Sequence, residues 1–177
     1  VDRLEEIIDA EPFTQWKNIQ ITPNVKYFQY VSVLLNLKHP ALQSKEVRQA
    51  LSFAIAKPEK NRVSTPLSSQ SWAYTNRIKQ YDQDVDLAKK LIAGAIPEEP
   101  ITLSTFPQYS ALADSIAAAW ENIGVKTKIK IQDGIPDEFD VLLATQEIPP
   151  DPDQYSFWHS TQKQTNLTQY ANHKIDK

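Results

Sequence analysis

The chain contains no cysteine and no methionine, and only three of its 177 residues are glycine. Without cysteine it cannot form disulfides, thiolate nucleophiles or cysteine-ligated zinc sites. Gly94, Gly124 and Gly134 are isolated from one another, so neither a phosphate-cradling loop nor a dinucleotide-binding fingerprint can be built. A cysteine-free chain suits an oxidising, extracytoplasmic compartment.

The sequence also lacks a long apolar run and an excess of basic residues. No run approaches the ~20 residues that a membrane-spanning helix needs. The net charge of −3 indicates no basic surface for a phosphate backbone, so we expect no nucleic-acid partner. The histidines at positions 39, 159 and 173 have no metal-binding spacing, and we predict no metal site.

The N-terminus has no start methionine and no signal peptide, so VDRLEEIID is expected to be the interior of a longer polypeptide. Hydrophobic residues make up 41% of the chain and aromatic residues 10%, which is typical of a globular domain. The length fits one domain, or one domain and a fragment, with a substantial core.

Helical and strand periodicities alternate along the chain and predict an α/β fold. The expected helices are 2–9, 45–56, 86–94, 108–124 and 152–160, and the expected strands are 27–37, 101–106, 125–131 and 139–145. Strand 27–37 is long and rich in β-branched and aromatic residues, which favours a central position in the sheet. Residues 57–82 show no periodicity and are expected to form a long ordered loop.

Local signals mark several of the helix ends. Ser44 and Asp84 are predicted to cap the helices that follow them. Helix 108–124 is predicted to bury Tyr109, Leu112, Ile116, Ala119, Trp120 and Ile123. Gly124 follows it, where a left-handed residue is required. Strand, helix and strand over 101–131 form a βαβ unit, which predicts a parallel pair of strands.

The segment FDVLLATQEIPPDPDQYSFWHS, residues 139–160, concentrates the candidate site residues. A buried strand here leads into a loop that carries Glu147, Asp151 and Asp153. Paired carboxylates can perform general acid–base catalysis, and a hydrolase using Glu147 and Asp151 is one alternative function. Asp151 and Asp153 flank Pro152 at a predicted helix start, which favours capping instead. Glu147 directly follows the strand, where no helix cap is needed. A contact with a ligand is therefore an equally good interpretation of this residue.

Aromatic side chains form the second group of candidates. Tyr155 and Trp158 share one face of the predicted helix and could line a pocket, although Trp158 could equally lie in the core. Trp72 lies among serines in the long loop, where no periodicity gives it a reason to be buried. Trp120, in an apolar stripe, is predicted to be core. A self-contained domain that binds a protein partner through its aromatic loops is a further alternative.

Several segments occur in an order that resembles the extracellular solute-binding proteins of family 5, the receptors of ABC transporters for oligopeptides, dipeptides, nickel chelates and some sugars. The segments are Leu35-Asn36-Leu37, VRQALSFAIA (47–56), DLAKKLIAGA (86–95), IGVKTKI (123–129), FDVLL (139–143), DPDQYSFW (151–158) and YANHKIDK (170–177). The resemblance covers residues from about 27 to the end. It implies a periplasmic-binding-protein-like (type II) fold, in which two lobes close on a ligand.

The resemblance implies that residues 27–177 form the C-terminal α/β lobe, truncated at its end, and that 1–26 form a lead-in. The loop after FDVLL would then face the cleft. Peptide receptors of the family place an aspartate where this chain has Ile148, and a tryptophan where it has Thr145, so recognition of a free peptide amine would rest on Glu147. Trp72 matches a loop aromatic that faces the ligand.

The sequence therefore predicts the solute receptor of an ABC importer, located outside the cytoplasm, free or lipid-anchored. Its partners would be a small solute, a peptide first among the candidates, the membrane permease, and a second lobe of the same polypeptide. We expect no catalysis and no cofactor. The predicted ligand-facing residues are Trp72, Gln146, Glu147, Tyr155 and Trp158.

Overall fold

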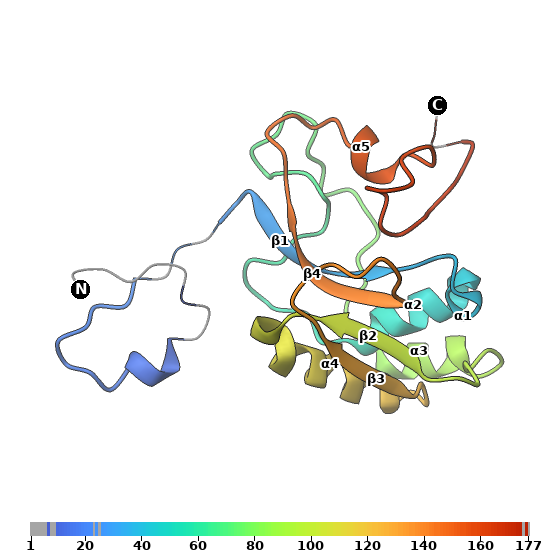
Figure 1. Ribbon diagram of the computed structural model, residues 1–177, viewed down its shortest axis with the longest axis horizontal. Helices are drawn as coiled ribbons and strands as arrows, with labels where there is room; N and C mark the ends of the chain where they lie inside the picture. Colours follow the sequence, from blue (N-terminus) through green and yellow to red (C-terminus); the bar gives the residue numbers. More distant parts are fainter. Residues whose placement is uncertain (1–6, 8–9, 23, 25, 175, 177) are drawn as a thin grey trace.

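The computed structural model describes residues 7, 10–22, 24, 26–174 and 176, and it confirms the α/β class (Figure 1). The element order is η1 (Glu11–Phe13), β1 (Gln29–Leu35), α1 (Pro40–Gln43), α2 (Lys45–Ala54), α3 (Val85–Ile92), β2 (Ile101–Thr105), η2 (Pro107–Tyr109), α4 (Ser110–Glu121), β3 (Thr127–Ile131), β4 (Val141–Glu147) and α5 (Tyr155–Trp158). The helix predicted over 2–9 lies outside the described residues, except for Ile7.

The strands form one mixed sheet in the order β1-β4-β2-β3. β2 is parallel to β3 and to β4, which confirms the βαβ unit, and β1 is antiparallel to β4. The prediction that β1 is a central strand is wrong, because it lies at one edge. Its β-branched and aromatic composition suits a pleated surface in general and does not distinguish an edge from a centre.

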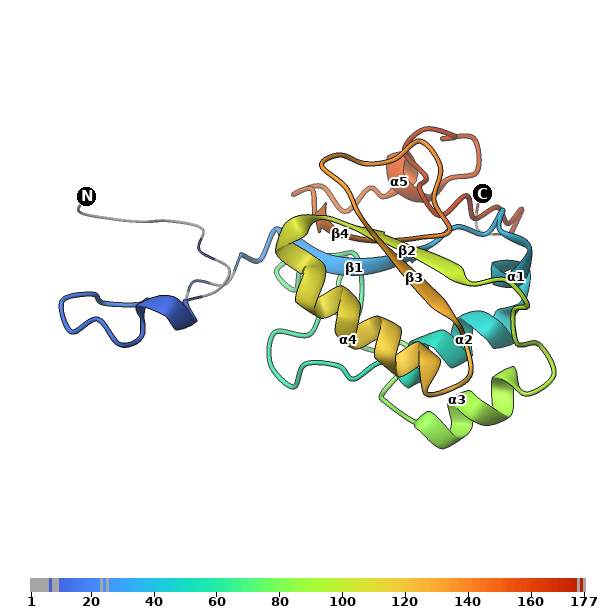
Figure 2. The same ribbon diagram turned by 60° about the horizontal axis from the view of Figure 1, so that its bottom comes forward.

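Helices α2, α3 and α4 form one layer on a single face of the sheet (Figure 2). Val141 and Leu143 of β4 point into this layer and are buried. Both predicted caps are confirmed. The Ser44 hydroxyl accepts a hydrogen bond from the Val47 amide at 3.3 Å, and Asp84 Oδ1 accepts one from the Leu87 amide at 2.9 Å.

Helix α4 supplies the largest core residue. Trp120 is 0% exposed, and its Nε1 donates a hydrogen bond to the Leu51 carbonyl of α2 at 3.0 Å. Gly124 ends the helical region at a φ of +89°, as predicted. One residue differs from the predicted buried face of this helix, since Leu112 is 43% exposed.

The opposite face of the sheet is covered by irregular chain. Leu34, Leu142 and Ala144 form a small buried cluster there, against which Phe106, Phe139, Trp158 and Leu167 pack. The covering segment follows β4, and the short helix α5 is the one helix among its described residues, so the helix predicted over 152–160 is confirmed in part. Pro152 and Asp153 lie before the helix, because their backbone forms turns instead.

Residues 10–22 lie apart from the α/β body in both views, and η1 is the regular element within them (Figures 1 and 2). No described helix has the length and hydrophobicity that crossing a bilayer requires.

Candidate functional site

A pocket of about 710 Å³ lies where β4 ends and β1 begins, and we call it the β4-end pocket. Its walls are Asn24, Lys26, Tyr27, Phe28, Gln29, Glu147, Ile148, Pro149, Pro150 and Phe157. Ligands of open α/β sheets bind outside the carboxyl ends of the strands, where the helical connections diverge. The β4-end pocket likewise lies beyond the carboxyl end of a strand, although the strand beside it there, β1, is antiparallel to β4.

Gln146 and Glu147 belong to strand β4, whereas the sequence places them in the following loop. Gln146 pairs with Tyr30 and Glu147 with Gln29. Alternation along the strand puts Gln146 on the same face as Ala144, which packs toward Trp158, and Glu147 on the other. Both side chains are therefore held by a rigid element. Glu147 is exposed and faces the β4-end pocket.

Ile148 is 5% exposed and forms part of the wall of the same pocket. Its amide donates a hydrogen bond to the Phe28 carbonyl at 2.7 Å, which extends the β1–β4 ladder by one residue pair. Thr145 points to the helix-covered face, where its hydroxyl forms a hydrogen bond with the Tyr109 hydroxyl. Thr145 therefore contributes to packing between the sheet and the helix-covered side, and Ile148 forms an apolar part of the wall of the β4-end pocket.

A second pocket, of about 450 Å³, lies along the outer edge of β1, and we call it the edge pocket. It is lined by Tyr30, Ser32, Val33, Leu34, Leu35, Leu37, Arg48, Val63, Ser64, Thr65, Pro66, Trp158, Thr168 and Tyr170. Burial raises the pKa of the Tyr30 hydroxyl above its usual value. The lining is mostly apolar, with Arg48 Nη1 occupied by the carbonyls of Leu42 and Gln43, both at 2.8 Å.

Helix α5 contributes a neighbouring residue to each pocket. Phe157 lines the β4-end pocket and Trp158 the edge pocket. Trp158 is half-buried, and its Nε1 donates to Gln154 Oε1 at 3.1 Å, so it serves both the packing and the pocket wall. Tyr155 is half-exposed, stacks on His159 with ring centroids 4.2 Å apart, and lines neither pocket.

The two aspartates after β4 stabilise turns. Asp151 Oδ1 accepts a hydrogen bond from the Asp153 amide, and Asp153 Oδ1 accepts one from the Tyr155 amide, each at 2.9 Å. The prediction that Asp151 caps helix α5 is wrong, because α5 begins at Tyr155 and Gln154 is its N-cap. The local side-chain-to-backbone role is nevertheless the expected kind.

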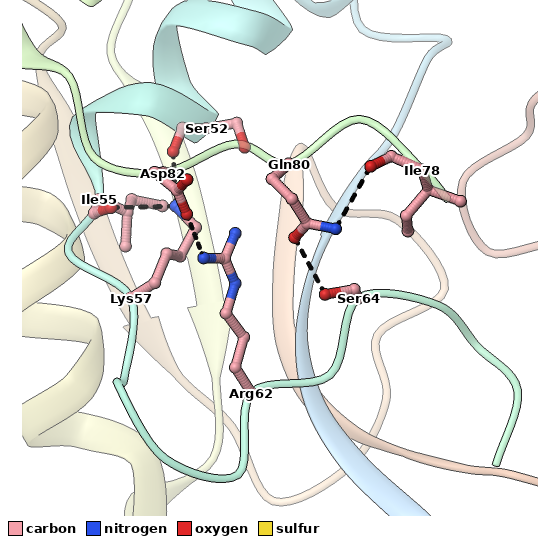
Figure 3. Close-up of polar contacts among 8 residues, drawn as sticks. All are labelled: Ser52, Ile55, Lys57, Arg62, Ser64, Ile78, Gln80 and Asp82. Atoms are coloured by element: carbon pink, nitrogen blue, oxygen red, sulfur yellow. Dashed lines mark hydrogen bonds and ion pairs between the residues drawn. The ribbon is translucent and has the colours of Figure 1, made fainter. Parts of the chain in front are cut away.

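The loop 57–82 is held at its base by polar contacts (Figure 3). Lys57 Nζ donates hydrogen bonds to the carbonyls of Ser52 at 2.6 Å and Ile55 at 2.9 Å, where α2 ends. The Arg62 guanidinium forms an ion pair with Asp82 across the loop. Burial, with a smaller contribution from the nearby Arg62 charge, lowers the pKa of Lys57 to about 8.

Beyond this base the loop continues along the edge pocket. The Ser64 hydroxyl donates to Gln80 Oε1 at 3.1 Å, which joins the two arms of the loop beside the pocket-lining residues 63–66 (Figure 3). Trp72, in the loop tip, is 89% exposed and lines neither pocket. The loop is therefore anchored at its base, while Trp72 and, to a smaller extent, Val63 and Tyr74 expose apolar groups to solvent.

The five predicted ligand-facing residues do not converge on one pocket. Glu147 lines the β4-end pocket and Trp158 the edge pocket, while Trp72, Gln146 and Tyr155 lie outside both. Sequence reasoning missed the contributions of β1 and the turn before it, among them Tyr30 and Phe28. The aromatic run before a strand was the available signal, but its place beside β4 depends on a long-range pairing. No three His, Asp or Glu side chains among the described residues are grouped so as to hold a metal ion.

The described residues thus form a mixed α/β sheet with helices on one face and two pockets beside β1. The pattern of the family described as "Bacterial extracellular solute-binding proteins, family 5 Middle" matches residues 5–167. The chain belongs to this family. The earlier resemblance is thereby confirmed.

Solved structures of two-lobed binding proteins share the fold. The substrate-binding protein CtaP of Listeria monocytogenes superposes with a TM-score of 0.74 at 24% identity, over 85% of this chain and 36% of that one. NikZ of Campylobacter jejuni, solved with Ni(L-His), gives 0.73 at 24% identity, over 84% and 37%. AppA of Bacillus subtilis, solved with a nonapeptide, gives 0.69 at 22% identity, over 84% and 37%.

Among curated proteins, heme-binding protein A of Haemophilus influenzae is 29% identical over 122 residues, which cover 59% of this chain and 21% of that protein. The chain thus spans about a fifth of the curated relative and little more than a third of the solved structures. These relatives are a heme-binding protein, a protein solved with a nickel complex and a protein solved with a peptide, so the family alone does not specify one solute.

Proposed function

We propose that these 177 residues form one lobe of the solute receptor of an ABC importer, acting outside the cytoplasm. The observation that carries the proposal is the β4-end pocket, which lies at the carboxyl end of a strand in a chain of the family 5 solute-binding proteins. The bound solute, a peptide or a related small molecule, would lie between this lobe and a second lobe. The second lobe would be formed by residues outside this sequence.

Glu147 is the residue that we assign to recognition of charge. Its carboxylate is exposed at a pocket that is also lined by Lys26 and by the apolar side chains of Tyr27, Phe28, Ile148 and Phe157. A carboxylate beside aromatic and aliphatic walls suits a solute with a cationic group next to apolar atoms. The amine of a peptide has this chemistry. Gln146 would add amide hydrogen bonds from the other face of the same strand.

The aromatic residues Trp72, Tyr155 and Trp158 complete the proposed contact surface. The exposed indole of Trp72 and the half-exposed ring of Tyr155 are large apolar groups that a ligand or a second lobe would cover. Ligand contacts with both lobes would favour the closed state, which the permease would recognise. This arrangement requires binding alone and no chemical step.

The test is calorimetric titration of the longer receptor polypeptide with short peptides, nickel–histidine and haem. One of these solutes should bind, and the 177-residue chain should bind it more weakly because half of the contacts are missing. For a cationic solute, Glu147→Gln should lower the affinity ~10- to 100-fold, as expected for a lost hydrogen bond to a charged group.

Glu121→Gln, which makes the same change of charge on α4, is the matched control and should bind as the wild type does. Failure of all three classes of solute to bind the longer receptor would contradict the proposal. An unchanged affinity in Glu147→Gln for a cationic solute would contradict the assigned residue.

A further inference from the structure

The amine of Lys57 belongs to a polar cluster at the base of the loop 57–82, which the proposed function does not use (Figure 3). The side chain is half-buried, and its Nζ donates hydrogen bonds to the carbonyls of Ser52 at 2.6 Å and Ile55 at 2.9 Å. A neutral amine has two N–H groups, as many as these two carbonyls accept. Its lone pair then remains available for a bond to an electrophile.

Two opposite charges act on this amine. The Arg62 guanidinium forms an ion pair with Asp82, and the two side chains are 25% and 75% exposed. The pKa of Lys57 is lowered to about 8, by burial first and by Arg62 second, against the opposing effect of Asp82. At pH 8 about half of the Lys57 side chains therefore carry a neutral amine, compared with on the order of 1% or less for an ordinary lysine.

The neighbouring cation discriminates among the small electrophiles that react with amines. An aldehyde forms an imine, whose protonated form would place a second positive charge beside Arg62. Carbon dioxide instead forms a carbamate, an anion that a guanidinium binds through two parallel hydrogen bonds. Asp82 is largely exposed and can turn toward solvent, which releases Arg62 for this contact. The cluster therefore suits carbon dioxide better than an aldehyde.

We propose that Lys57 is a binding site for carbon dioxide, at which Nζ forms a carbamate that pairs with Arg62. The nitrogen lone pair forms the new N–C bond, one C=O bonding pair moves onto its oxygen, and one amine proton leaves to solvent. The carbamate nitrogen keeps one N–H and therefore retains one of its two carbonyl acceptors. The step is reversible and requires no reactant besides carbon dioxide.

The carbamate would change how the loop is held. The Arg62–Asp82 ion pair connects the two arms of the loop, whereas a contact between Arg62 and residue 57 lies within the first arm. The hydrogen bond from Ser64 to Gln80 would remain between the arms. Hydrogen exchange in the loop should therefore accelerate in bicarbonate relative to chloride at the same ionic strength, because the base opens more easily.

The test is to trap carbamates by alkylation on the 177-residue chain in carbon-13-labelled bicarbonate at pH 8, and to locate them by peptide mass spectrometry. The label should be at least ~10-fold higher at Lys57 than at Lys60, an exposed lysine of the same loop, because far more of the Lys57 amine is neutral. The amino terminus of the chain is the positive control, since an α-amine titrates near ~7.7–8.0.

A charge variant separates a carbamate site from an amine that is merely neutral. Acetic anhydride gives a product without charge, so acetylation reports the neutral fraction of Lys57 in each variant. In Arg62→Gln the ratio of carbamate to acetyl label at Lys57 should fall ~2- to 5-fold, as for the loss of a partly exposed ion pair. Arg77→Gln, the same change at an exposed position of the loop, is the matched control and should leave the ratio unchanged.

Equal carbamate label at Lys57 and Lys60 would overturn the inference. So would label at the amino terminus with none at Lys57. An unchanged ratio in Arg62→Gln would overturn the pairing of the carbamate with Arg62, and with it the preference for carbon dioxide over an aldehyde. These measurements involve no transported solute, so their failure is distinguishable from failure of the proposed receptor function.

Discussion

The two faces of the sheet are stabilised by different kinds of interaction. On the helix-covered face, α2, α3 and α4 pack a continuous apolar core around Trp120 and Leu143. On the other face a smaller apolar cluster is covered by irregular chain, which depends on side-chain hydrogen bonds such as those of Asn166. Both candidate pockets include residues of this irregular chain or of the loop 57–82. The described residues thus combine a well-packed core on one face with irregular, pocket-lining chain on the other.

The core side should lose the most stability when one residue is removed. Trp120→Ala should lower the free energy of unfolding by about 3–5 kcal/mol, because it leaves a large cavity. The variant also leaves the Leu51 carbonyl without its indole donor. Urea unfolding followed by circular dichroism measures the change.

Trp72→Ala is the matched control, since its indole is 89% exposed. It should change the unfolding free energy by no more than about 0.5 kcal/mol. Equal losses in the two variants would show that the loop tip packs as the core does, and the contrast between the two sides would be wrong.

The irregular side should depend on one buried polar residue. Asn166 is 2% exposed, and its Nδ2 donates to the carbonyls of Trp158 at 3.2 Å and Tyr170 at 2.8 Å, while its Oδ1 accepts from the Thr168 hydroxyl at 2.9 Å. Asn166→Ala should cost about 1–3 kcal/mol, because these buried groups lose their partner.

The effect of Asn166→Ala should be concentrated in the C-terminal segment. Hydrogen exchange should accelerate around Trp158 and Tyr170 more than in α4, since local opening is then easier than global unfolding. Asn76→Ala, at an exposed position in the loop 57–82, should match the wild type. Uniform acceleration across the whole chain would indicate that the two sides unfold as one unit.

The same division separates what could be predicted from the sequence and what could not. Helix α2 with its Ser44 cap, helix α4 with Trp120, and the left-handed Gly124 follow from short-range patterns, and the structure confirms them. Their signals lie within one or two turns of chain, so neighbouring residues suffice.

The edge position of β1 and the extension of β4 through Glu147 could not be predicted in this way. Both depend on Gln29 and Tyr30 pairing with residues more than a hundred positions later. Strand propensity indicates that a segment suits a sheet, but it does not indicate the position of the strand within the sheet. The pairing partner is therefore known only from the structure. The same limit applied to the candidate site. Glu147 was identified from the sequence, but its aromatic neighbours Tyr27 and Phe28, which precede β1, were not.

The smallest predicted effect concerns the base of the loop 57–82, at the end of α2. The pKa of Lys57 is lowered to about 8, by burial first and by Arg62 second, whereas an unfolded lysine titrates near ~10.4. Between these values the unfolded chain binds more protons than the folded one. Stability from this group should therefore rise as the pH increases from about 8 toward ~10.

Lys57→Met should remove this rise, which is measured as the difference in unfolding free energy between wild type and variant at pH 7, 8, 9 and 10. Lys60→Met, at an exposed position of the same loop, should retain the wild-type dependence. Solvent reaches Lys57 in part, so the effect should be small. The contrary outcome is a difference in unfolding free energy between wild type and Lys57→Met that stays constant over this range. It would mean that the hydrogen bonds to the Ser52 and Ile55 carbonyls keep the Lys57 ammonium charged. The loop base would then be as firmly fixed as the core.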